Sequence, residues 1–147
     1  MIKYLLLNKI DDMKSKLIFE IISILFLSLL SCESNNPDGK WEDNIKLSTK
    51  EVSFSAQSDA VIITTEGTSW WINGIGMNDD WSYDISGIDT MQDNFLIEEP
   101  EFTIERKNAK EIHISMTENQ SAIERTLTIG LQAGNYFDGI KIIQSGN

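Results

Sequence analysis

Apolar residues recur at every second position through most of the chain after Asn44, rather than at every third or fourth position. In the stretch Glu111–Met116, for example, Ile112, Ile114 and Met116 alternate with polar residues. Successive side chains of an extended strand point to opposite faces, so this period places the apolar side chains on one side. The pattern therefore predicts strands that each bury one face.

Seven to nine short stretches fit this pattern, and β-branched residues are plentiful in them. The expected strands are Val52–Ala56, Ala60–Thr65, Trp70–Ile75, Trp81–Ile85, Phe95–Glu98, Phe102–Arg106, Glu111–Met116, Ile123–Leu131 and Phe137–Gln144. No convincing amphipathic helix follows Cys32. Strands this short and closely spaced favour an all-β antiparallel sandwich over a fold that alternates strands with helices.

The residues before this region have the character of an export signal. A basic start, Met13-Lys-Ser-Lys, precedes the apolar run Ile21–Leu30. As a helix this run would rise about 15 Å, half of a hydrocarbon core about 30 Å thick, so it is too short to span a membrane comfortably. We expect residues 1–31 to be a cleaved signal peptide. Met13 is an alternative start, because Met1–Asp12 places acids before the basic segment.

Leu29-Leu30-Ser31-Cys32 closes the apolar run and resembles the lipobox of bacterial lipoproteins. The resemblance implies that Cys32 is the lipidation site and that its acyl chains hold the mature protein at a membrane. We expect an outer-membrane lipoprotein, on the periplasmic side or at the cell surface. The polar segment 32–43 is expected to be a flexible tether, and residues 44–145 a single folded domain.

Charge and size exclude several classes of function. The export signal holds four of the 12 basic and three of the 23 acidic residues, so the mature part has a formal net charge of −12. Such acidity repels nucleic-acid phosphates and anionic headgroups, so no nucleic-acid partner is expected. One small domain offers little room for a deep catalytic cleft, so we expect neither an enzyme nor a cofactor. With Cys32 as the single cysteine, no disulfide forms within the chain.

Short motifs follow one another in a recognisable order along the folded region. They are Leu47–Phe54, Ala60–Thr65, Ser69–Ile72, Trp81, Ile112–Ser115 before Asn119, Arg125–Ile129 and Ile140–Gln144. The last two are the most telling, because a strand that begins with Arg125 is followed by a final strand that ends with Gln144. In this order the region Ile45–Gln144 resembles the BACON domain, the Bacteroidetes-associated carbohydrate-binding often N-terminal module.

The resemblance implies an immunoglobulin-like β-sandwich and a carbohydrate-binding function. It predicts a lipid-anchored module that recognises a polysaccharide or a glycoprotein weakly. The alternative is a non-catalytic spacer or a protein–protein interaction module that holds a protein partner at the membrane. The segment between Trp81 and Phe102 departs from the family pattern, because it is longer and more acidic than the usual brief connection.

Aromatic residues supply the candidate ligand-binding site. Trp70 and Trp71 are neighbours in an expected strand, so only one of them faces the core. Ile72 shares the face of Trp70, which assigns Trp70 to the core and leaves Trp71 free to stack on a sugar ring. Trp81 and Tyr83 share a face of their own stretch and would complete an aromatic platform with Trp71. The hydroxyl-binding groups expected beside the platform are Asn78 and Asp80.

Each of these residues also has a structural interpretation. Trp71 would instead pack beneath the loop that follows its strand, and Trp81 and Tyr83 would belong to the core. If Trp71 and Tyr83 are exposed together, the binding module is favoured over the spacer.

The acids between Asp79 and Asp93 suggest calcium, because hard oxygen ligands suit that ion. Their spacing matches no EF-hand, so a solvated acidic loop is the preferred interpretation and no metal ligand is predicted. His113 is the single histidine and falls on a polar strand face beside Glu111 and Ser115. One such histidine supports no catalytic triad, so no catalytic residue is predicted.

Overall fold

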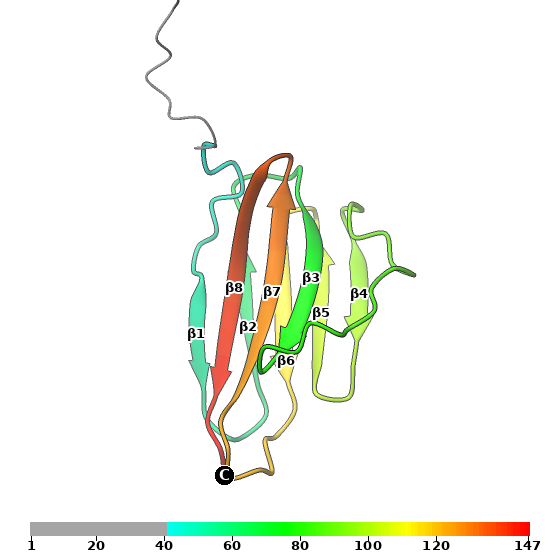
Figure 1. The fold of residues 1–147 in the computed structure, drawn as a ribbon. Coiled ribbons are helices and arrows are strands. Elements are labelled where there is room, and N and C mark those ends of the chain that lie inside the picture. The colour runs from blue at the N-terminus through cyan, green and yellow to red at the C-terminus, as the bar shows by residue number, and fades with distance from the viewer. Residues whose placement is uncertain (1–40) are drawn as a thin grey trace, which may run out of the picture. The chain divides into compact units, whose positions relative to one another are not determined.

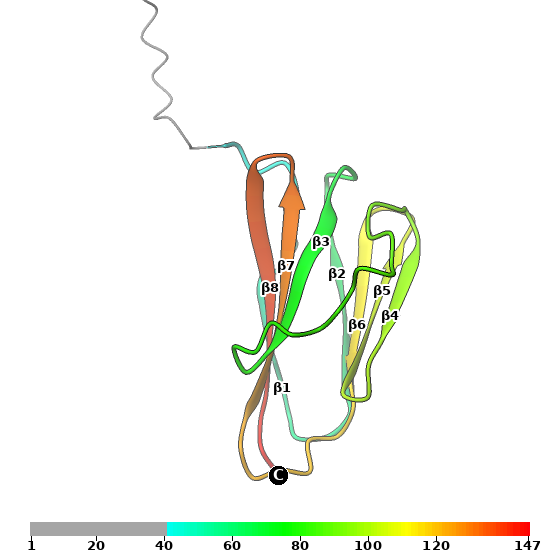
Figure 2. The same ribbon diagram turned by 45° about the vertical axis from the view of Figure 1, so that its right-hand side comes forward.

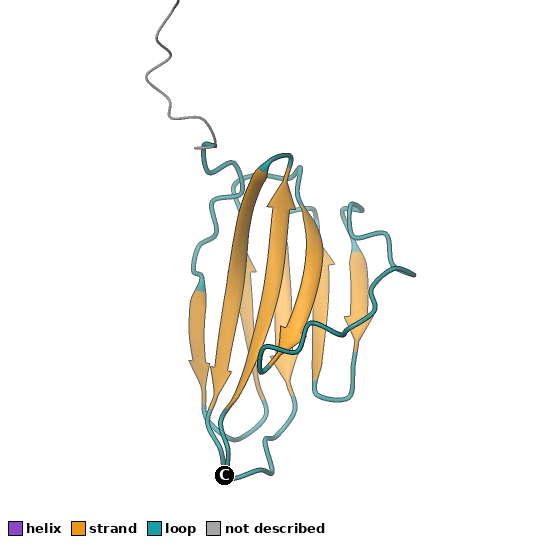
Figure 3. Ribbon diagram, viewed as in Figure 1, coloured by secondary structure: helices purple, strands orange, loops and turns teal. Residues whose placement is uncertain are grey.

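The computed structural model describes residues 41–147, which contain eight strands and no helix (Figures 1 and 3). The predicted signal peptide, Cys32 and most of the predicted tether lie outside the described residues. In the described part, no helix is long and apolar enough to cross a membrane. The strands are β1 (Glu51–Phe54), β2 (Asp59–Thr64), β3 (Trp71–Met77), β4 (Phe95–Glu98), β5 (Phe102–Lys107), β6 (Glu111–Met116), β7 (Arg125–Ala133) and β8 (Tyr136–Gln144).

The strands form two four-stranded sheets, with orders β1-β8-β7-β3 and β2-β6-β5-β4. Figure 2 shows the two sheets facing one another as separate layers. Five of the six strand pairings are antiparallel, and the exception is the parallel pairing of β1 with β8. The prediction of an all-β, immunoglobulin-like antiparallel sandwich is confirmed, and eight strands lie within the expected seven to nine.

The core lies between the two sheets and follows the alternation in the sequence. Along β6 every second residue is buried, and along β7 the same holds from Leu127 to Ala133. Burying one such aliphatic side chain contributes roughly 1.5–3 kcal/mol. The largest buried apolar side chains are Ile45, Ile63, Trp70, Ile72, Ile75, Phe102, Ile104, Ile112, Ile114, Leu127 and Ile129.

A buried arginine closes one end of the core. Arg106 is 1% exposed, and its guanidinium lies 3.7 Å from the centroid of the Trp70 ring. Its nitrogens donate to backbone carbonyls, among them those of Trp70 at 2.8 Å, Thr68 at 2.6 Å and Ala109 at 3.0 Å. Burial lowers the pKa of Arg106, yet the ring and the carbonyl dipoles compensate the buried charge. Arg106 also donates to the Gln92 carbonyl at 3.1 Å. It therefore ties the β2–β3, β3–β4 and β5–β6 loops to the end of β5.

At the opposite end of the core, Arg125 and Gln144 connect neighbouring parts of the chain. These are the two residues that mark the last two motifs in the sequence. Arg125 and Gln144 are opposite one another in β7 and β8, and Arg125 Nε donates to Gln144 Oε1 at 2.8 Å. The fully buried Gln144 Nε2 donates to the carbonyls of Gln57 at 2.9 Å and Thr117 at 3.0 Å. Since Gln57 and Thr117 follow strands of the two different sheets, Gln144 links the layers.

The predicted strand Trp81–Ile85 is absent, and this prediction is wrong. A tight turn ends β3 at Met77, and the chain from Trp81 to Ile85 then runs without a strand partner. Within this segment Trp81 lies on the outside of the sandwich, whereas Tyr83 and Ile85 pack against the core. Trp81 and Tyr83 have the spacing of two residues on one face of a strand. In the loop, however, Trp81 points outward and Tyr83 points inward, so the two side chains do not share a face.

Candidate functional site

The outer face of the sheet β1-β8-β7-β3 carries the most distinctive group of exposed aromatic residues. Along β7 the inward residues are buried, so the residues between them point outward. These outward positions are Thr126, Thr128, Gly130 and Gln132. Trp71 is the register partner of Gln132 and therefore lies on the same outer face. The neighbours Trp70 and Ile72 are both 2% exposed. This burial agrees with the prediction that Trp70 lies in the core and Trp71 on the outer face, where Trp71 is half-buried.

A two-residue turn directs the chain back over this face. Asn78 and Asp79 have positive φ angles of 52° and 68°, and Met77 and Asp80 exchange two backbone hydrogen bonds of 2.9 and 3.0 Å. This is the geometry of a type I′ turn, which Asn and Asp tolerate well. In Figures 1 and 2 the chain leaving β3 crosses the outer side of that strand before it runs to β4. The turn thereby delivers Trp81 to the outer face.

Trp81 lies on the backbone of β3, where two glycines leave room for its ring. A β-carbon at Gly76 would lie 3.0 and 3.2 Å from ring atoms of Trp81, and one at Gly74 would lie 3.3 Å from another. Such contacts are at or below the normal packing distance, so a side chain at either position would push the ring away. Trp81 nevertheless remains 53% exposed. It offers a fixed aromatic surface to solvent.

A third aromatic residue, Phe137, belongs to the same face. It is 61% exposed and pairs with Gln132, which in turn pairs with Trp71. Trp71 and Phe137 thus lie in one row across three strands, with backbones about 10 Å apart. The sequence contained a signal for Phe137, because it has the same parity in β8 as the outward Lys141. We call Trp71, Trp81 and Phe137 the aromatic face.

A shallow polar depression of about 440 Å³ lies on the same outer face. Its lining residues are Asn78, Asp79, Ile123, Glu124, Thr126, Thr128 and Lys141. Thr128 pairs directly with Gly76, the residue beneath the Trp81 ring, so the ring borders the depression. Hydroxyl, carboxylate and ammonium groups thus lie beside the apolar surface of the Trp81 ring.

Tyr83 does not join the aromatic face, and the predicted platform is wrong in this respect. Its ring packs edge-on against the buried Phe102, with centroids 5.1 Å apart and an angle of 71°. Trp71 and Tyr83 are therefore not exposed together, so this criterion does not favour the binding module over the spacer. Burial raises the pKa of the Tyr83 hydroxyl. The Asn78 side chain is also occupied, since its Oδ1 accepts the Thr126 backbone N–H at 2.8 Å. Asp80 is exposed, and its backbone serves the turn.

The acidic loop organises itself locally. Hydrogen bonds from the side chain and the backbone of Ser86 lower the pKa of Asp84, and those from the Gln92 side chain and the Met91 backbone lower the pKa of Asp89. Within residues 41–147, no three acidic, histidine or cysteine side chains gather in a way that could hold a metal ion. The Asp84 and Asp89 carboxylates therefore accept hydrogen bonds from residues of their own turns.

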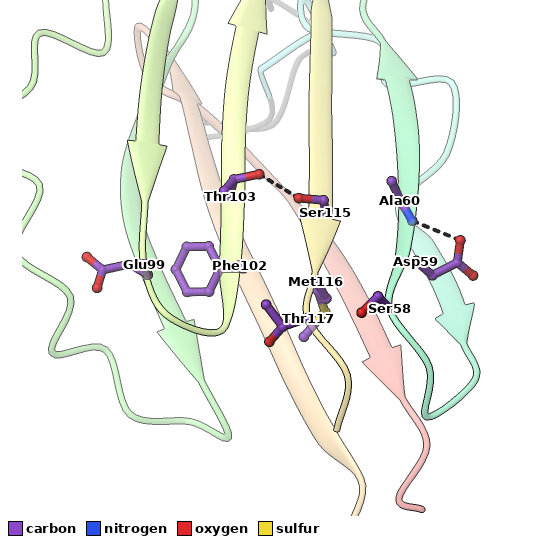
Figure 4. Close-up of a pocket in the computed structure, with 9 residues that line it drawn as sticks. All are labelled: Ser58, Asp59, Ala60, Glu99, Phe102, Thr103, Ser115, Met116 and Thr117. Carbon is purple, nitrogen blue, oxygen red and sulfur yellow. Dashed lines mark hydrogen bonds between the residues drawn. The ribbon is translucent and has the colours of Figure 1, made fainter. Parts of the chain in front are cut away.

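The outer face of the other sheet holds a broader depression of about 570 Å³, drawn in Figure 4. Its floor is a row of small residues across β2, β6 and β5, in which Ala60 pairs with Ser115 and Ser115 with Thr103. Further along β6, His113 Nε2 lies 2.7 Å from Glu111 Oε2. Figure 4 shows the Thr103 and Ser115 hydroxyls hydrogen bonded to one another and the Asp59 carboxylate accepting the Ala60 backbone N–H.

No family model and no curated protein matches this chain. Among solved structures, a protein from Bacteroides thetaiotaomicron studied by NMR is similar in fold, with a TM-score of 0.60 and 20% identity, over 80% of this chain and 98% of that one. The CsuC–CsuE chaperone–adhesion subunit complex of Acinetobacter baumannii pili gives a TM-score of 0.38 and 11% identity, over 70% of this chain and 57% of that one. At these identities the likeness concerns the fold alone.

Proposed function

We propose that this protein is a BACON-like module, anchored to the outer membrane through lipid on Cys32, that binds polysaccharide or glycoprotein weakly through the aromatic face. The binding proposal rests mainly on the position of Trp81. Its half-exposed indole packs against two glycines and lies beside a polar depression. A flat ring of this kind complements the C–H face of a sugar, and neighbouring polar groups can bind its hydroxyls.

The packing of the Trp81 ring against the β3 backbone supports recognition. A side chain that is already held in place loses little conformational entropy when a ligand stacks on it. Trp71 and Phe137 add apolar surface within about 10 Å of one another, enough to engage neighbouring parts of an extended ligand. The shallow shape of the face favours weak binding to a long, accessible chain over tight capture of a small molecule.

The paired Arg125 and Gln144 support the proposed relation to BACON domains. These are the residues on which the resemblance depends most, and they are hydrogen bonded to one another at the end of the sandwich. Their contacts give a structural reason for an arginine at the start of one strand and a glutamine at the end of the next. The pair is a feature of the fold and takes no part in the proposed binding.

Substitution of Trp81 tests the proposal, with Trp41 as a matched control. Trp41 is 56% exposed, close to the 53% of Trp81, but it lines a separate depression with Gly134 and Asn135 of the β7–β8 turn. Trp81→Ala should weaken polysaccharide binding by about 5- to 30-fold, because a stacking contact with its buried area contributes roughly 1–2 kcal/mol. Trp41→Ala should leave binding unchanged.

The measurement is calorimetric titration of the full chain in detergent with soluble polysaccharides and a mucin glycoprotein. Equal losses in the two variants would point to a nonspecific aromatic effect. No binding by the unsubstituted protein to any of these ligands would favour the alternative proposal, a non-catalytic spacer or protein-interaction module.

A further inference from the structure

Asn73 is the extra residue of a β-bulge in the middle of the aromatic face. The register of β3 against β7 shifts between Ile72, which pairs with Leu131, and Gly74, which pairs with Gly130. A bulge of this kind redirects a side chain, and bulges are frequent beside functional sites. Here Asn73 becomes exposed and lies along β3 between Trp71 and the glycines beneath Trp81.

Gly130 on the neighbouring strand makes room for the Asn73 carboxamide. A β-carbon at Gly130 would overlap Asn73 Oδ1, so the carboxamide lies directly over that glycine on the outer surface. Gly130 in turn pairs with Gly139 of β8. The row Gly74, Gly130 and Gly139 thus forms a floor without side chains, and Asn73 is the polar group above it.

We propose that Asn73 determines the specificity of this site for neutral sugars, an inference that rests on the proposed function. A carboxamide offers an N–H donor and a carbonyl acceptor side by side, which complements hydroxyl groups that both donate and accept. Among residues 41–147 the Asn73 side chain makes no hydrogen bond. By contrast, Asn78 Oδ1 already accepts the backbone N–H of Thr126 in β7. Gln132, in the row between Trp71 and Phe137, donates its amide to the Gly134 carbonyl at 2.9 Å. Asn73 is thus the carboxamide of this face whose donor and acceptor are both available.

The charges around the face favour a neutral ligand. Asp79 and Glu124 line the depression beside Trp81, and Lys141 is the single cation among its lining residues. The whole chain has a net charge of −11. A polyuronate or a sulfated glycan would meet net repulsion during approach and in the bound state. A neutral polysaccharide meets no such penalty and can use the same aromatic contacts.

The first test compares Asn73→Ala with Asn135→Ala, a substitution of an exposed asparagine in the β7–β8 turn. Affinities of the full chain in detergent are measured for mixed-linkage β-glucan, mannan and arabinoxylan, with polygalacturonate as the anionic counterpart. Asn73→Ala should weaken the best neutral ligand by about 3- to 10-fold, the usual effect of losing one or two hydrogen bonds. It should also reduce the differences among the neutral ligands, while Asn135→Ala changes neither property.

A second variant leaves Asn73 in the sequence but shifts the position of its side chain. In Gly130→Ala the new methyl group takes the space of Asn73 Oδ1, and the flexible carboxamide must move while both tryptophans stay in place. Gly130→Ala should therefore weaken the best neutral ligand as Asn73→Ala does, and should add nothing in the Asn73→Ala background. Unchanged melting temperatures would confirm that neither substitution acts through unfolding.

The outcomes separate this inference from the proposed function. If the unsubstituted protein binds no polysaccharide, both are overturned. If it binds but Asn73→Ala retains full affinity and selectivity, the role of Asn73 alone is refuted. An equal loss from Gly130→Ala with and without Asn73 would mean that the ligand touches the glycine itself, which also contradicts the inference. Tighter binding of polygalacturonate than of every neutral polysaccharide would refute the choice of ligand.

Discussion

Replacing Trp70 by alanine should be far more harmful to stability than replacing its neighbour Trp71. Trp70 is 2% exposed, its ring stacks on the buried Arg106, and its Nε1–H donates to Thr65 Oγ1 at 3.1 Å. Removing a buried aromatic side chain costs about 3–5 kcal/mol, and a desolvated cation–π contact adds to that loss. Since a domain of this size has a total stability of about 5–15 kcal/mol, Trp70→Ala should approach complete unfolding.

Trp71→Ala removes a half-buried ring from the outer face of β3 and empties no core position. Its effect on the free energy of unfolding should stay near 1 kcal/mol, as for most substitutions that leave the core intact. Equilibrium urea unfolding of both variants, in the fragment that begins at Lys40, measures the difference directly. A stable Trp70→Ala protein together with an unfolded Trp71→Ala protein would refute the assignment of the two faces.

Three other outcomes are expected. Cys32→Ala should abolish detergent partitioning, because the acidic chain has no other proposed membrane affinity; a variant that still partitions would contradict the lipid anchor. The fragment from Lys40 onward should fold alone, and EDTA should leave its melting temperature unchanged, whereas a clear drop would revive a calcium site in the acidic loop. Gln144→Ala should cost about 1–3 kcal/mol in urea unfolding, because it removes a fully buried carboxamide that donates to the carbonyls of Gln57 and Thr117 and accepts from Arg125 Nε; a change as small as that of the more exposed Gln132→Ala would contradict this.

The strands could be predicted because local alternation and core burial have the same cause. In β6 the side chains that alternate in the sequence are those that alternate between core and solvent. The opposite faces of Trp70 and Trp71 follow from the same geometry. The parallel pairing of β1 with β8 could not be predicted in this way, since it joins segments at opposite ends of the domain and no local pattern records it.

The errors arose where tertiary contacts override that alternation. Trp81 and Tyr83 have the spacing of strand neighbours, but the glycines of β3 accept one ring and Phe102 accepts the other. Alternate glycines in a strand are a signal that another group packs on its backbone. Arg106 has the parity of the buried Phe102 and Ile104 and is itself buried, which was not predicted from the sequence. Only the convergence of several loop carbonyls explains why it is buried.

The proposed binding face can be tested most directly by chemical-shift mapping. An isotope-labelled fragment from Lys40 onward is titrated with the neutral oligosaccharide that corresponds to its best polysaccharide ligand. We predict that the largest changes occur at the indole N–H groups of Trp71 and Trp81 and at the backbone amides of Gly74 and Gly130. Changes confined to His113 and Ser115 on the other sheet, or no changes at saturating sugar, would contradict the proposal.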